Sequence, residues 1–145
     1  MATINAYLYF KNTTEEAFNF YKSVFGGEFI TVQRFRDTPE GDTIPEDDKD
    51  KIMHISLPIG DGSILMGTDA IGGMGSQLVE GNNFHLSVNA DSEGEIARIF
   101  HALAEGGKIT VPLDILSWGA YFGMLTDKFG IQWMVNYDVN TSNNG

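Results

Sequence analysis

The chain repeats the order of its helical and β-prone segments, and this repetition constrains its fold more than any other feature. A glycine pair ends a helix-like stretch in each half, and similar residues follow it, GGEFITV from Gly26 and GGKITVP from Gly106. Each copy then leads to a hairpin-like run, DGSILM from Asp61 and FGIQWM from Phe129. The echo favours a duplicated βαβββ module.

The second of these hairpins is the most sharply patterned stretch of the chain. Residues 118 to 137 read WGAYFGMLTDKFGIQWMVNY, with β-prone runs at 120–126 and 131–137. Between the runs, residues 127–130 supply turn residues, and Gly130 can adopt a positive φ. The pattern predicts two strands joined by a tight turn.

Each half also holds one amphipathic helix pattern. Thr13 with Glu16, and Ser92 with Glu95, fit the capping-box spacing at a helix N-terminus. Apolar residues then recur at helical spacing until the glycine pairs end both stretches. These apolar stripes are Ala17, Phe18, Tyr21, Val24 and Phe25 in the first helix, and Ile96, Ile99, Phe100 and Leu103 in the second.

The remaining segments complete an α+β fold of two βαβββ modules. The acidic residues 36–51 predict a loop and the glycine-rich residues 71–82 a linker. Gly27 and Gly62 are 35 positions apart but Gly107 and Gly130 only 23, so the acidic loop is interpreted as an insertion of 12 residues. The other strands are predicted at 4–10, 28–35, 51–59, 63–69, 83–89 and from 108. The modules then cover about 4–69 and 83–137 of a single domain over 1–145.

Composition narrows the possible functions. The 145 residues include no cysteine, which excludes a disulfide framework, thiolate chemistry and cysteine-ligated zinc. The formal net charge of −11 argues against nucleic acid or an anionic membrane as partners, because both would be repelled. The sequence shows no basic and apolar leader and no long apolar run, so we expect a cytoplasmic protein.

Four predicted strands divide their side chains in the same way, because successive residues of a strand point to opposite faces. The apolar face should pack on the helices, and it comprises Ala6, Leu8, Phe10, Met53, Ile55, Leu57, Ile59, Phe84, Leu86, Val88, Ile131, Trp133 and Val135. The opposite face is polar but carries tyrosine and histidine, so it either lines a concave binding surface or faces water. The candidate ligand-binding residues are Tyr7, Tyr9, His54, Ser56, His85, Ser87, Trp118 and Met134.

Motifs that would name a reaction are missing from the sequence. It contains no G-x-S-x-G elbow, no P-loop, no G-x-G-x-x-G after a strand and no H-E-x-x-H. The glycine tract at 72–75 is expected to lead into linker rather than a helix, which argues against a phosphate cradle.

Three runs of the sequence resemble a known family. AYLYFKNTTEEAFNFYKSVFGGEF, IMHISLPIGDGSILMGTDA and WGAYFGMLTDKFGIQWM are similar to the PhnB-like branch of the vicinal oxygen chelate superfamily. This superfamily includes glyoxalase, extradiol dioxygenases and the fosfomycin and bleomycin resistance proteins. The resemblance implies paired βαβββ modules, curved mixed sheets around a cavity with helices outside, and a homodimer.

The resemblance also implies where a divalent metal would bind. Members that use a metal place His or Gln in the first strand, Glu in the fourth, His in the fifth and Glu in the last. These positions fall here at Asn5, Met66, Asn83 and Met134, with His85 two residues beyond Asn83. Asn is a poor single ligand and a thioether does not suit hard ions, so we expect neither a metal site nor another cofactor.

The resemblance leaves several functions open. We expect a small-molecule binding protein with a metal-free cavity. The alternatives are a metal-dependent lyase or dioxygenase that uses His54 or His85, and an antibiotic-sequestering protein whose acidic charge attracts a cationic drug. The branch is often labelled a demethylubiquinone methyltransferase, but the glycine-rich loop in a parallel sheet that would hold the cofactor is not visible in the sequence. Whether the chain is an enzyme stays open.

Overall fold

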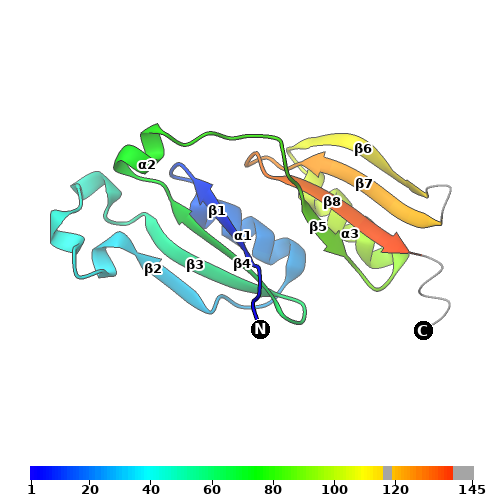
Figure 1. The fold of residues 1–145 in the computed structure, drawn as a ribbon, viewed down its shortest axis with the longest axis horizontal. Coiled ribbons are helices and arrows are strands. Elements are labelled where there is room, and N and C mark those ends of the chain that lie inside the picture. Colours follow the sequence, from blue (N-terminus) through cyan, green and yellow to red (C-terminus); the bar gives the residue numbers. More distant parts are fainter. Residues whose placement is uncertain (116–118, 139–145) are drawn as a thin grey trace. The chain divides into compact units, whose positions relative to one another are not determined.

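Each half of the chain folds into a four-stranded mixed sheet with a helix of 12 residues against one face (Figure 1). The computed structural model describes residues 1–115 and 119–138. The two halves are separate compact units, Met1–Val79 and Glu80–Gly145. Within the described ranges, the helices lack the combination of length and apolar character that crossing a membrane requires.

The first unit has its strands in the spatial order β1-β4-β3-β2, with β1 parallel to β4 and the other neighbours antiparallel. The β2–β3 connection contains three short 3-10 turns, and a short helix follows β4. The elements are β1 (Ala6–Phe10), α1 (Thr14–Phe25), β2 (Thr31–Arg34), η1 (Phe35–Asp37), η2 (Gly41–Thr43), η3 (Glu46–Asp48), β3 (Ile52–Ile59), β4 (Ser63–Asp69) and α2 (Gly72–Ser76).

The second unit has the equivalent order β5-β8-β7-β6, again with its first and last strands parallel. Its elements are β5 (Leu86–Asn89), α3 (Glu93–Ala104), β6 (Lys108–Ile115), β7 (Ala120–Thr126) and β8 (Gln132–Asp138). The predicted hairpin is therefore β7 and β8, joined by the turn at 127–131.

The repeated topology confirms the predicted α+β class and the two βαβββ modules. The extra residues of the first copy lie between β2 and β3, where η1 to η3 occur, whereas β7 begins five residues after β6 ends. Two further expectations stay predictions. One is that the sheets enclose a cavity, and the other is that the modules at about 4–69 and 83–137 form one domain.

The core of each unit lies between its helix and the apolar face of its sheet. In each unit a glycine of the sheet lets the helix approach the sheet closely. A Cβ on Gly67 would lie 2.6 Å from Cε1 of Phe18. A Cβ on Gly123 would likewise lie 2.7 Å from Cε2 of Phe100. Among the buried apolar residues are Leu8, Phe10, Ala17, Tyr21, Val24, Ile55, Leu57 and Leu65 in the first unit, and Ile96, Ile99, Leu103, Leu125, Trp133 and Val135 in the second.

The alternation predicted for β3 is interrupted near its start. Gln33 pairs with His54 but the next residue of β2, Arg34, pairs with Ile52, so Met53 is the extra residue of a β-bulge. A bulge puts the following side chains out of phase. Ile52 is therefore fully buried, and the prediction that Met53 is the core residue was wrong because Met53 is only half-buried.

Other predictions also need correction. Phe84 was expected on the apolar face, but it precedes β5 and is 59% exposed. The glycine tract predicted as linker forms α2, because backbone bonds from Gly75 to Ile71 and from Gln77 to Gly73 close its turns. The predicted acidic loop, by contrast, is present between β2 and β3, and it contains the 3-10 turns η1, η2 and η3.

The two long helices begin in different ways. In α3 the predicted cap is present, since the Ser92 hydroxyl accepts a 3.1 Å hydrogen bond from the Glu95 backbone N–H. In α1 the side chain of Thr13 makes no capping bond. The orphan N–H of Thr14 instead donates to the Asp69 carboxylate, which arrives from the end of β4.

The Asp69 carboxylate joins three elements of the first unit. Its Oδ1 accepts from the backbone N–H and the hydroxyl of Thr14, at 3.1 and 2.7 Å, and its Oδ2 accepts from the Ile52 N–H at 2.8 Å. Asp69 is only 3% exposed. Both carboxylate oxygens face hydrogen-bond donors, so an aspartate fits this position and an amide does not.

We predict that Asp69→Asn destabilises the protein by about 1–3 kcal/mol, because the amide would turn a donor toward a buried N–H. Urea unfolding of the variant, compared with the exposed Asp47→Asn as a charge-matched control, measures the difference. Equal stability of the two variants would show that the Asp69 carboxylate does not join α1 to β3.

Candidate functional site

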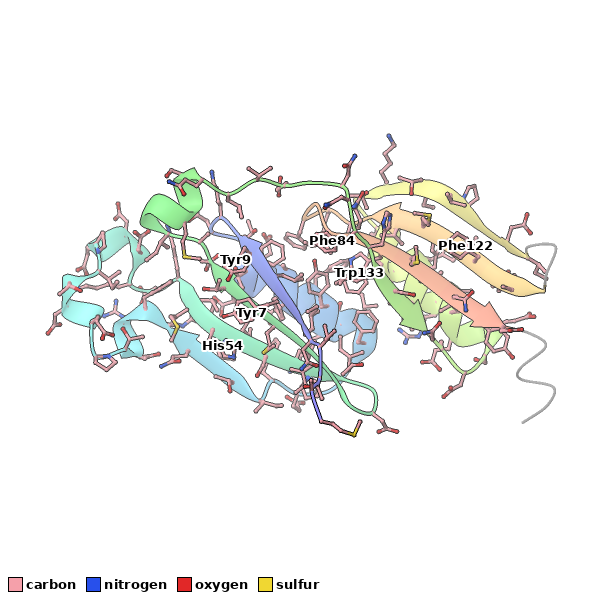
Figure 2. The ribbon with its side chains drawn as sticks, in the orientation of Figure 1. Tyr7, Tyr9, His54, Phe84, Phe122 and Trp133 are labelled. Atoms are coloured by element: carbon pink, nitrogen blue, oxygen red, sulfur yellow. The ribbon has the colours of Figure 1, made fainter. Side chains whose placement is uncertain are left out.

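Two tyrosines and a histidine lie together on the face of the first sheet opposite α1 (Figure 2). The Tyr7 hydroxyl lies 3.0 Å from Nδ1 of His54. The Tyr7 ring centroid lies 5.5 Å from that of Tyr9 and 5.6 Å from that of His54. We call these three residues, with Ser56 and Met66 between and beside them, the tyrosine–histidine face.

Strand register explains why these residues meet. The parallel pairing of β1 with β4 sets Tyr7 opposite Met66 and Tyr9 opposite Thr68. The antiparallel pairing of β4 with β3 then sets Met66 opposite Ser56, two residues from His54 and on the same face. The tyrosines on β1 and the histidine on β3 thus flank β4, and the Tyr7 hydroxyl reaches across β4 to the imidazole.

The face is partly open to solvent. Tyr7 and Tyr9 are 39% and 43% exposed, His54 is half-buried and Ser56 is buried. Burial of the phenol, and secondarily the neighbouring Tyr9, raise the pKa of Tyr7 above its usual value of about 10. Tyr7 therefore carries its proton at neutral pH and can donate a hydrogen bond.

The predicted residues of the second unit lie on the corresponding face of its sheet. Ser87 of β5 is opposite Met134 of β8, which is in turn opposite Met124 of β7. His85 lies one residue before β5 and is half-buried. The predicted residue Trp118 lies outside the described residues. The structure therefore groups Tyr7, Tyr9, His54 and Ser56 in one unit, and Ser87 and Met134 in the other.

The positions that would hold a family-type metal do not carry suitable donors. Met66 lies in β4 opposite Tyr7, and Met134 lies in β8 opposite Ser87, so each row offers a thioether and a hydroxyl. Asn5 and Asn83 precede strands β1 and β5. Within 1–115 and 119–138, no group of three or more His, Cys, Asp or Glu residues could hold a metal ion. These donors do not fit a hard divalent ion.

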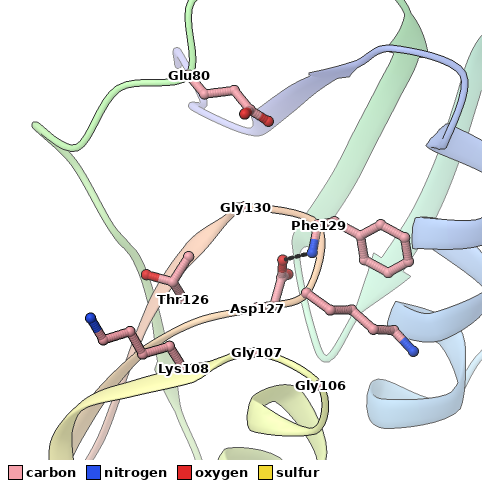
Figure 3. A pocket seen from close by; sticks show the side chains of 9 residues that line it. Glu80, Gly106, Gly107, Lys108, Thr126, Asp127, Phe129 and Gly130 are labelled. Carbon is pink, nitrogen blue, oxygen red and sulfur yellow. Dashed lines mark hydrogen bonds between the residues drawn. The ribbon is translucent and has the colours of Figure 1, made fainter.

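A pocket of about 490 Å³ lies elsewhere in the second unit, at one end of its sheet (Figure 3). The sequence patterns did not indicate this pocket, because its walls come from turns and strand ends rather than from a strand face. The lining residues are Glu80, Gly106, Gly107, Lys108, Thr126, Asp127, Lys128, Phe129 and Gly130. Its lysines and its glutamate are exposed, so little in it is desolvated.

The buried acid of this pocket has a structural role. Asp127 is 3% exposed, and its Oδ1 accepts from the backbone N–H groups of Phe129 and Ile131 at 2.8 and 3.1 Å. Its Oδ2 accepts from Nε1 of Trp133 at 2.9 Å. The carboxylate therefore holds the β7–β8 turn and anchors a core indole. The β3–β4 turn of the first unit also contains an aspartate, Asp61, but this one is exposed.

We expect Asp127→Asn to cost about 1–3 kcal/mol of stability, because its amide would oppose the buried indole N–H. Asp61→Asn makes the same chemical change in the equivalent turn and should leave stability within about 0.5 kcal/mol. Paired denaturant melts of the two variants check this. The interpretation fails if both variants lose stability equally.

Comparison with known proteins places the chain in a family. The sequence profile of the family described as 3-demethylubiquinone-9 3-methyltransferase matches residues 2–136, and the chain belongs to this family. A solved structure of protein PA1353 from Pseudomonas aeruginosa is 38% identical, with a TM-score of 0.80, over 95% of this chain and 98% of that one. Protein YjdN from Escherichia coli K12 is 29% identical over 92% of this chain and 93% of its own.

The PhnB protein from Bacillus cereus is also similar, with 28% identity and a TM-score of 0.74 over 94% of this chain and 99% of that one. The predicted resemblance to the PhnB-like branch is thereby confirmed. A glyoxalase/bleomycin resistance protein/dioxygenase family enzyme from Burkholderia phytofirmans shares the fold, with a TM-score of 0.61 at 14% identity. The chain is therefore a PhnB-like member of its family, and it shares its fold with this enzyme.

Proposed function

We propose that the chain binds a small molecule on the tyrosine–histidine face of its first sheet. The observation that carries the proposal is the hydrogen-bonded Tyr7–His54 pair beside Tyr9, held on paired strands yet partly exposed. Aromatic rings with a polar tip supply apolar contact and can also orient a ligand. The Tyr7 ring lies against both the Tyr9 and the His54 rings, so the three residues offer one continuous aromatic surface to a ligand.

The proposed binding surface has a defined chemistry. Tyr7, Tyr9 and Met66 would contact the apolar body of the ligand, and the hydroxyl and imidazole groups would select its polar atoms. Ser87, Met134, His85 and Trp118 are proposed as further contacts from the second half of the chain. The proposal includes no metal, because the donors at the family-type positions do not fit one.

Two other functions have weaker support. The methyl transfer named in the family description would need a glycine-rich loop in a parallel sheet to hold its cofactor. Here each sheet contains a single parallel strand pair, and Lys11 and Asn12 rather than glycines follow β1. The net charge of −11 favours cationic ligands, as an antibiotic-sequestering protein would require. Seven of the 20 acidic residues lie in the loop between β2 and β3, where Arg36 pairs with Asp50 and Lys49 with Glu46.

A thermal-shift screen of oxygenated and cationic compounds, with chelator and then with added divalent ions, tests the proposal. We expect a compound that raises Tm in the presence of chelator, and an affinity that falls at least about tenfold in Tyr9→Ala and in His54→Ala, the equivalent of 1.4 kcal/mol. His101→Ala, on the exposed side of α3, is the matched control and should bind normally. A shift that needs metal, with turnover of a hemithioacetal or a catechol, would favour the enzyme instead.

We further propose that the chain is a homodimer. Each sheet ends in edge strands, and apolar side chains on two of them are partly exposed, among them Val32 on β2 and Ile109 and Ile115 on β6. Pairing with a second copy would cover such edges. Sedimentation at micromolar concentration should give twice the chain mass of 16.0 kDa, and a purely monomeric species would contradict this.

A further inference from the structure

The direction of the hydrogen bond between Tyr7 and His54 decides which ligands the face can accept. We infer that Tyr7 donates its hydroxyl hydrogen to Nδ1 of His54 and fixes the imidazole with its proton on Nε2, so that the face selects a ligand with an uncharged acceptor oxygen, such as a carbonyl. The inferred ligand class rests on the proposed function, but the position of the proton on the imidazole can be tested without a ligand.

The first step concerns which atom carries the shared hydrogen. At 3.0 Å, one hydrogen lies between the Tyr7 oxygen and Nδ1 of His54. If Nδ1 carried it, the 39% exposed phenol would have to donate to water, because among the described residues the Tyr7 hydroxyl has no second partner. If the phenol carries it, a single bond satisfies the hydroxyl donor and the Nδ1 acceptor together.

The surroundings of the phenol favour the second arrangement. Burial and the neighbouring Tyr9 disfavour the phenolate, so the hydroxyl keeps its hydrogen. No carboxylate within 1–115 and 119–138 pairs with His54, so no described acid competes for a proton on Nδ1. In a neutral imidazole that accepts at Nδ1, the proton lies on Nε2.

The imidazole is then a fixed donor. Its ring lies 5.6 Å from the Tyr7 ring, with 35° between the planes, and the hydrogen bond to Tyr7 limits its rotation. Within the described residues, Nε2 makes no hydrogen bond of its own, and His54 is only half-buried. A ligand atom that pairs with Nε2 must therefore accept a hydrogen bond.

The charge of the face decides between acceptor types. None of the residues that strand register places on it is an acid, a lysine or an arginine, and they are Tyr7, Tyr9, Thr31, Gln33, His54, Ser56, Pro58, Ile64, Met66 and Thr68. Arg34, at the end of β2, is held by Glu15 of α1 through two bonds of 3.1 and 2.7 Å. A carboxylate or phosphate would lose water here without gaining a cation, whereas a carbonyl oxygen loses little.

The tautomer is tested by nitrogen-15 NMR of the histidine side chains in the ligand-free protein. Only His54, His85 and His101 contribute signals, and His54→Gln assigns the one of interest. We expect His54 to be protonated on Nε2, and the Nδ1 resonance to move toward that of a free acceptor nitrogen in Tyr7→Phe. A proton on Nδ1, or no change in Tyr7→Phe, would overturn the assignment.

The ligand class is tested with three probes that share one aromatic ring, namely acetophenone, benzoate and benzylamine. NMR titration should show acetophenone binding about 3- to 10-fold more tightly than the two charged probes, the range expected for one hydrogen bond. The advantage should vanish in His54→Phe and persist in His101→Phe, with backbone spectra confirming that both variants are folded.

Equal or tighter binding of benzoate or benzylamine would overturn the proposed selectivity. If none of the probes binds while the imidazole shows the expected tautomer, the proposed function fails and the Tyr7–His54 assignment stands. If acetophenone binds equally well to His54→Phe, the small-molecule function holds and the role of the imidazole is refuted.

Discussion

The parallel pairing of the first and last strands is the constraint on which the rest of each unit depends. It closes the βαβββ module, because the helix must cross from β1 to β2 before the hairpin returns β4 to the side of β1. In the first unit the pairing sets Tyr7 beside Met66 and brings the phenol within reach of His54. Without this pairing, two tyrosines and a histidine separated by more than 40 positions would not meet.

The two units meet the same structural demands with different residues. The N-terminus of α3 is capped locally by Ser92, whereas that of α1 is capped by Asp69 from the far end of the module. The turn between the last two strands holds a buried aspartate in one unit, Asp127, and an exposed one in the other, Asp61. The same topology is thus compatible with different capping and turn residues in its two copies. The tyrosine–histidine face likewise belongs to the first unit only.

Local patterns predicted much of this structure. Strand alternation correctly placed Tyr7, Tyr9, His54 and Ser56 on one face, since period-two patterns survive wherever the ladder is regular. Prediction failed where distant residues decide the outcome. The bulge at Met53 depends on the pairing with β2, and the cap on α1 comes from 55 positions away. The pocket near Phe129 is built from turns and strand ends, whose shape no periodicity encodes.

The central claim is that the tyrosine–histidine face, rather than the pocket beside Lys108 and Phe129, receives the ligand. Mapping backbone amide shifts during titration with a compound that stabilises the protein distinguishes the two surfaces directly. The account predicts the largest shifts at Tyr7, Tyr9 and His54, with residues 106–108 and 126–130 unchanged. Shifts confined to those turn residues, with the face unchanged, would contradict it.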